Sequence, residues 1–250
     1  SGNVGVMLAY LTVGFMAQRW SWTTPLFVWA GAGLVLAGLG LLSLRGVPAV
    51  NDEIRPRQEM RSWWHSLVAV KRFIPGFFFG GMGWSVIIFY APSLLNHRFG
   101  IPMGRAGLYL ALWMGIGTVT GYSYGLFSRR FGRKNIFLTT LGGSAVCLLV
   151  LGLSPARFPA VAALLVYGGL LLMTYPALHT FVGTTVRPGG QTRAFSWVSN
   201  IQILSGALVS LVSGFLSDAL GIHVPFIFTA VLTLAIFIFY LPRGPEFFGG

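Results

Sequence analysis

Residues 105–153 read RAGLYLALWMGIGTVTGYSYGLFSRRFGRKNIFLTTLGGSAVCLLVLGL. Two long apolar stretches are separated here by the short basic segment SRRFGRK. A helix of about 20 residues crosses a hydrocarbon core of roughly 30 Å, and both stretches have about this length. Backbone groups in lipid must be paired within their own segment, so long runs rich in Gly, Ala and Leu indicate helices and not the shorter, alternating strands of a barrel. We therefore predict two membrane-spanning helices joined by a tight basic turn.

The same alternation of apolar stretch and polar loop extends over the whole chain of 250 residues, of which 55% are hydrophobic and 9% charged. The sequence predicts an all-α polytopic membrane protein with about eight transmembrane helices. The expected spans are residues 4–17, 24–44, 73–95, 105–127, 135–153, 158–182, 195–217 and 222–241.

Basic residues are distributed unevenly between the two sets of alternate loops. The chain has 17 Lys and Arg residues and a formal net charge of +12. Arg19, Arg98, Arg105 and Arg157 belong to one set of loops, and the other 13 basic residues belong to the opposite set. Cytoplasmic loops of membrane proteins are enriched in Lys and Arg. We therefore expect the richer side, which includes the C-terminus, to be cytoplasmic. The positive charge then indicates topology and contact with the lipid bilayer, and we expect no nucleic-acid partner.

The basic turn at residues 125–134 (GLFSRRFGRK) resembles the loop signature G-x-x-x-D-[RK]-x-G-[RK]-[RK] of the major facilitator superfamily. The residues that match the signature are Gly125, Arg130, Gly132, Arg133 and Lys134. Arg129 stands at the acidic position, so a gating contact that depends on a carboxylate is in doubt here. The resemblance implies that this loop joins the second and third helices of a six-helix half and takes part in conformational change.

Two further stretches are similar to parts of the same family. Residues 19–27 (RWSWTTPLF) resemble the external turn between its fifth and sixth helices, and residues 214–221 (GFLSDALG) resemble a family helix end. The resemblance covers the chain as helices five to twelve, so we expect four helices to precede Ser1. It implies three parts: residues 1–45 as the last two helices of the N-terminal half, 46–72 as a cytoplasmic loop, and 73–250 as the C-terminal six-helix half. Residues 57–71 within the loop have the pattern of an amphipathic interfacial helix, with a basic linker as the alternative.

Polar and aromatic side chains recur on single faces of several spans, and such faces avoid lipid. The family resemblance implies that these helices line a central cavity. The candidate cavity residues are Tyr10, Trp84, Tyr90, Tyr109, Trp113, Tyr175, His179, Ser199 and Gln202. For each of them, hydrogen bonding between helices without solute contact remains an alternative. Glycines four residues apart, such as Gly117, Gly121 and Gly125, favour close helix approach in the same spans.

No Asp, Glu, Lys or Arg stands in the middle of an expected span, and His179 is the one titratable candidate near a span's cytoplasmic end. Cys147 is the only cysteine, so we expect neither a disulfide nor a thiolate metal site. No metal or cofactor is expected, and no nucleophile or metalloprotease motif favours an enzyme. The family resemblance implies a secondary active transporter of the cell (inner) membrane that moves a small organic solute, with a coupling proton or ion left open. A non-transporting receptor or scaffold on the same fold and a polytopic membrane enzyme are the alternatives.

Overall fold

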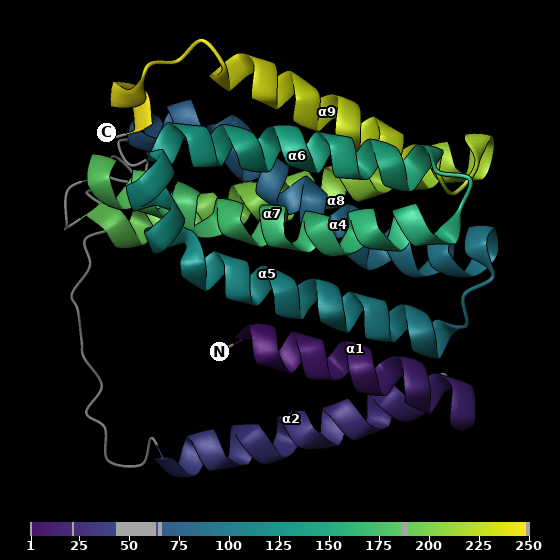
Figure 1. The fold of residues 1–250 in the computed structure, drawn as a ribbon. Helices are drawn as coiled ribbons and strands as arrows, with labels where there is room; N and C mark the ends of the chain where they lie inside the picture. The colour runs from purple at the N-terminus through teal and green to yellow at the C-terminus, as the bar shows by residue number, and fades with distance from the viewer. Residues whose placement is uncertain (1, 22, 44–63, 65–66, 187–189, 249–250) are drawn as a thin grey trace.

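The computed structural model describes residues 2–21, 23–43, 64, 67–186 and 190–248. Its eight long helices in these ranges lie at the positions of the eight expected spans (Figure 1). They are α1 (Gly2–Arg19), α2 (Thr24–Ser43), α4 (Ile74–Phe99), α5 (Met103–Phe131), α6 (Arg133–Leu153), α7 (Arg157–Thr185), α8 (Gln191–Leu220) and α9 (Val224–Tyr240). The predicted all-helical fold is confirmed. Most of the proposed amphipathic segment 57–71 lies outside the described residues.

Five of the described helices are long and apolar enough to cross a membrane by length and composition. They are α2, α6, α7, α8 and the helix that includes α4. The apolar stretches Gly5–Ala17 of α1 and Val224–Tyr240 of α9 are shorter. α5 is 29 residues long, but its glycines, threonines and tyrosines lower its hydropathy. A helix of this composition is better covered by other helices than by lipid.

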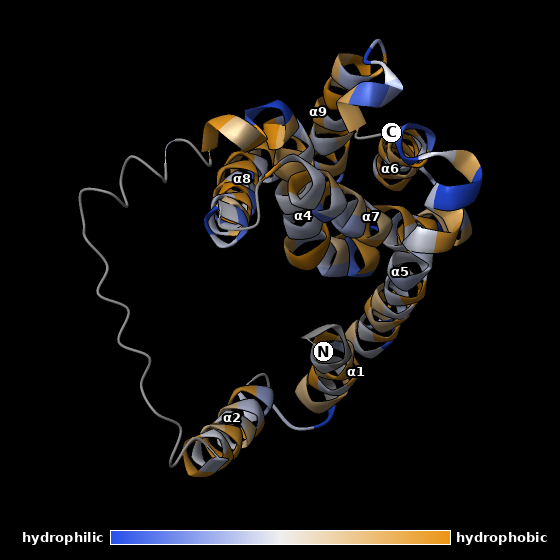
Figure 2. Cartoon of the chain, turned by 90° about the vertical axis from the view of Figure 1, so that its left-hand side faces the viewer, coloured by the Kyte–Doolittle hydropathy of each residue, from blue (hydrophilic) through white to orange (hydrophobic). Residues whose placement is uncertain are grey.

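The helices run alongside one another, and α4 to α9 form one bundle (Figures 1 and 2). Within it α4 packs on α8, α5 packs on α7, and α6 lies between α7 and α9. α1 packs along α5 on the outside of this bundle, and α2 follows α1 away from it. Pro25 is the one buried residue among the described side chains of α2, so its Leu and Val side chains are left for lipid.

The turn between α5 and α6 consists of Gly132 alone. Its φ of +82° is in a region that residues with a Cβ rarely adopt. The Gly132 N–H donates to the Ser128 carbonyl at 3.0 Å, and the Gly132 carbonyl accepts from the Ile136 N–H at 3.2 Å. The backbone N–H of this one glycine therefore pairs with a carbonyl at the end of α5, and its carbonyl pairs with an N–H at the start of α6.

An aromatic cluster closes the end of the bundle at which the C-terminus lies. It consists of Phe73, Phe137, Phe181, Tyr240 and Phe248, all almost fully buried. Phe248 belongs to the short helix η3 (Pro245–Phe248), which folds back onto the bundle. Its ring lies 5.7 Å from that of Phe137 and 5.3 Å from that of Phe181. The Tyr240 hydroxyl accepts from the Gly76 N–H and donates to the Arg72 carbonyl, at 3.2 and 3.1 Å. These two hydrogen bonds join the end of α9 to the start of α4.

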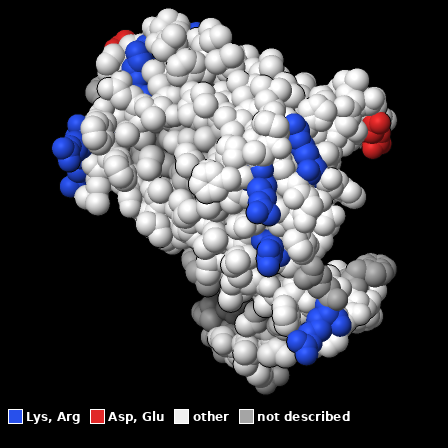
Figure 3. Space-filling model, turned by 45° about the vertical axis from the view of Figure 1, so that its right-hand side comes forward, with Lys and Arg blue, Asp and Glu red and all other residues white. Residues whose placement is uncertain are grey.

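Charged side chains lie near the two ends of the helices, and a broad uncharged surface separates them (Figure 3). Among the described residues, the end with the α5–α6 turn has eight basic residues: Lys71, Arg72, Arg129, Arg130, Arg133, Lys134, Arg193 and Arg243. The opposite end has Arg19, Arg98, Arg105 and Arg157. The uncharged surface is the part suited to the hydrocarbon core.

Candidate functional site: a cavity between four helices

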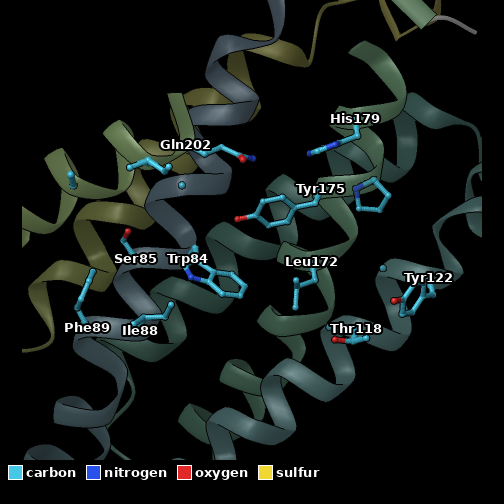
Figure 4. Close-up of a pocket in the computed structure, with 16 residues that line it drawn as sticks. Trp84, Ser85, Ile88, Phe89, Thr118, Tyr122, Leu172, Tyr175, His179 and Gln202 are labelled. Carbon is cyan, nitrogen blue, oxygen red and sulfur yellow. The ribbon is translucent and has the colours of Figure 1, made fainter. Parts of the chain in front are cut away.

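A cavity of about 860 Å³ lies between α4, α5, α7 and α8. No Asp, Glu, Lys or Arg is among its lining residues, His179 is the titratable group in the wall other than Tyr122 and Tyr175, and most of the lining is apolar. Trp84 and Gln202 enter it from α4 and α8, and Tyr175 and His179 enter it from α7 (Figure 4). A volume of this size accommodates a small organic molecule.

Four of the nine residues expected in a cavity line this one: Trp84, Tyr175, His179 and Gln202. The three aromatic side chains among them are fixed by contacts with neighbouring residues. The Trp84 ring lies 6.4 Å from the Tyr175 ring in an edge-to-face arrangement. The Tyr175 hydroxyl donates to the Gly80 carbonyl of α4 at 2.9 Å. His179 stacks on Phe195 of α8 at 5.3 Å. These contacts restrict the rotamers of the cavity wall before any ligand enters.

The other five candidates lie outside the cavity lining. Trp113 is fully buried behind Trp84, with ring centroids 5.4 Å apart. The Tyr90 hydroxyl donates to the Ser210 carbonyl at 2.7 Å, which joins α4 to α8. The remaining three are the partly buried Tyr10 of α1, the partly buried Tyr109 of α5 and the exposed Ser199 of α8.

The packing of α5 explains why Trp113 and Thr120 face α7 and not the cavity, although Gly117 on the same face also lines the cavity. A methyl group added at Gly117 would meet the Gly168 carbonyl and Leu172 of α7, so the two helix backbones approach closely there. Trp113 lies one turn earlier on that face, and the Thr120 hydroxyl donates to the Gly169 carbonyl at 2.9 Å. This face of α5 packs against α7, as small residues at helix crossings allow.

Several cavity residues were not among the sequence candidates. From α5 these are Gly117, Thr118, Gly121 and Tyr122. The other three helices contribute Gly81, Ser85, Ile88, Phe89, Leu172, Pro176, Ile203 and Ala207. Thr118 and Tyr122 are four residues apart and share one helix face. This spacing could have indicated a second candidate face of α5 in the sequence, next to the face of Tyr109 and Trp113.

The face of α8 that carries Gln202, Ser205 and Gly206 is mostly a packing surface against α4. A methyl group at Gly81 of α4 would collide with the Gln202 carbonyl, and one at Gly206 would collide with the Ser85 hydroxyl. The Ser205 hydroxyl donates to the Gln202 carbonyl at 2.9 Å within α8. Gln202 stands where this surface meets the cavity, so its side chain reaches the cavity although its backbone is in the packing surface.

In the part of the chain that the structure describes, no group of three or more His, Cys, Asp or Glu residues could hold a metal ion. None of the loop-signature residues is among those that line the cavity. The loop lies at one end of the helices (Figure 1). Arg130 lies over the Phe131 ring at 5.5 Å, and Gly125 has open space beside it. Arg133 and Lys134 form the first turn of α6.

The model of the Major Facilitator Superfamily matches residues 1–154 and 119–247 of the chain, two overlapping segments that together include nearly all of it. The chain belongs to the major facilitator superfamily. The predicted family is thus confirmed. A search of curated proteins finds no significant match to the chain.

This major facilitator protein is an integral, multi-pass membrane protein. It is a membrane transporter of the major facilitator type, and members of this family bind small solutes and are typically transporters rather than enzymes.

Proposed function

We propose that the protein is a secondary active transporter that moves a small organic solute through the cavity between α4, α5, α7 and α8 by alternating access. The observation that carries the proposal is the cavity itself, with Trp84, Tyr175, His179 and Gln202 converging in it from three helices. A mostly apolar wall with a few convergent polar groups is typical of sites for small molecules.

The contact between α1 and α5 supports a rocking movement. A methyl group at Gly14 of α1 would lie 3.0 Å from the Met103 carbonyl, and one at Gly107 of α5 would lie 2.6 Å from the Tyr10 carbonyl. Smooth, small-residue surfaces let helices change their relative tilt with few side chains in the way. In the proposed division, residues 1–45 belong to one half and 73–250 to the other, so this contact joins the two halves.

We further propose that the protein lies in the cell (inner) membrane with its C-terminus in the cytoplasm, and the charge distribution supports this orientation. The end that carries η3 and the α5–α6 turn has the larger number of described basic residues, and the positive-inside rule assigns that end to the cytoplasm.

Uptake into proteoliposomes tests the transport proposal. Liposomes containing the full chain are incubated with a mixture of metabolites, and the accumulated solutes are identified by mass spectrometry against protein-free liposomes. For an accumulated solute, Trp84→Ala should raise the half-saturating concentration roughly tenfold, because the variant removes one aromatic wall of the cavity. Phe158→Ala is the matched control, since Phe158 is 81% exposed on the outside of α7 and should leave uptake unchanged.

Saturable binding without accumulation of any solute would favour a receptor on the same fold. Conversion of a bound solute into a different molecule would favour a membrane enzyme. Either result would contradict the transport proposal.

A further inference from the structure

The hydrogen-bonding groups of the cavity differ in how far they are already satisfied. The Tyr175 hydroxyl donates to the Gly80 carbonyl at 2.9 Å, and the Thr118 hydroxyl donates to the Met114 carbonyl at 2.8 Å. Each of these two hydroxyl groups already donates its one hydrogen to a carbonyl of the protein. They can therefore shape a ligand site but have little donor capacity left for the ligand.

Gln202 is different, because its amide nitrogen is enclosed and has no hydrogen-bond partner among the described residues. A methyl group at Gly80 would lie only 3.0 Å from this nitrogen, so the amide rests directly against α4. The end of the side chain points into the cavity, toward Tyr175 and His179 (Figure 4). A buried polar group without a partner is unfavourable, and a ligand that pairs with it removes this cost.

The carboxamide of Gln202 carries a donor and an acceptor side by side and no charge. Its geometric complement is a group that offers an acceptor and a donor at the same spacing, as another carboxamide does. Pairing with such a ligand requires the Gln202 amide to turn its nitrogen away from Gly80.

The walls beside Gln202 select for a flat, apolar body. The Trp84 ring is supported from behind by Trp113, and the His179 ring is held by its stacking on Phe195. Rings fixed in this way offer their free faces and edges to a ligand ring at little entropic cost. No Asp, Glu, Lys or Arg is among the residues that line the cavity, so an ionic solute would lose its hydration without a counter-charge.

We propose that the cavity binds an uncharged, ring-containing solute through a carboxamide-like group that pairs with Gln202, with its ring against the aromatic wall formed by Trp84 and Tyr175. The inference rests on the proposed function, because it takes this cavity to be the solute site. It goes further by naming the chemical class of the solute and the residue that recognises it.

The test measures how tightly four probes, which share one ring system and differ in its substituent, bind at equilibrium to the full chain in lipid nanodiscs. The probes are 2-naphthamide, 2-naphthoate, 2-naphthylmethylamine and naphthalene. We expect saturable binding of 2-naphthamide, with at least tenfold weaker binding of the anion, the cation and the plain hydrocarbon. Equal affinity for the amide and the carboxylate, or no saturable binding of 2-naphthamide, would overturn the inference without any variant being made.

Variants of Gln202 then assign the selectivity. Gln202→Ala should weaken binding of 2-naphthamide about tenfold, and Gln202→Glu should shift the preference toward 2-naphthylmethylamine. Asn200→Ala is the matched control, since Asn200 is an exposed amide two residues earlier on α8. Unchanged affinity of folded Gln202→Ala, judged by its melting curve, would contradict the assignment. Selective binding without any uptake would refute the transport proposal alone, whereas uptake of a solute with no preference for the amide would refute this inference alone.

Discussion

Gly168 of α7 shows how a single hydrogen in place of a side chain sets the distance between two helices. A methyl group there would lie 2.6 Å from Cδ1 of Trp113 and would also collide with the Trp113 carbonyl of α5. Over-packing of this kind costs about 1–3 kcal/mol. We expect Gly168→Ala to lower the thermal unfolding midpoint of the protein in detergent. Gly183 is the control on the same helix, because nothing lies within 4 Å of a methyl group there. Gly183→Ala should leave the midpoint unchanged or raise it slightly, and equal loss in both variants would mean that the α5–α7 contact is not tight.

At the scale of an element, η3 closes the bundle by inserting Phe248 between three helices. Its ring contacts Phe137 of α6, Phe181 of α7 and Tyr240 of α9, and only 1% of the residue is exposed. Removal of a buried phenyl ring typically costs about 3–5 kcal/mol. Phe248→Ala should therefore lower the unfolding midpoint clearly, measured by a fluorescence melting curve. Phe158→Ala removes the same atoms from an exposed site and should change it little. A Phe248→Ala midpoint equal to that of Phe158→Ala would show that η3 is not docked in solution.

At the scale of the whole molecule, the distribution of basic residues predicts which end faces the cytoplasm. Cys147 is the only cysteine, so Cys147→Ser gives a background without thiols into which single cysteines can be placed. In intact cells, an impermeant maleimide should label cysteines at positions 98 and 157, and label those at 131 and 243 only after the membrane is opened. Positions 98 and 157 border connections at one end of the bundle, and 131 and 243 lie at the other. Labelling of 98 and 243 from the same side would contradict the proposed topology.

The candidate site was only partly predictable. The sequence put Trp84, Tyr175, His179 and Gln202 on polar or aromatic faces, and these residues do meet in one cavity. On α5 it favoured Tyr109 and Trp113, whereas the α5 residues that line the cavity are Gly117, Thr118, Gly121 and Tyr122. Both faces of α5 mix glycine, aromatic and hydroxyl residues, so periodicity alone could not tell a helix contact from a cavity wall.

The helical class, the positions of the spans, the tight turn at Gly132 and the distribution of charge between the two ends follow from the amino-acid sequence. These features depend on local physics, because hydropathy over one helix length and turn chemistry need no distant partner. The tertiary structure alone decided how each helix is rotated about its axis: Gly117 and Gly168 turn α5 and α7 toward each other, and Gly81 and Gly206 do so for α4 and α8. In lipid the hydrophobic effect no longer distinguishes an inward from an outward apolar face, so close packing between helices sets their rotation and thereby the lining of the cavity.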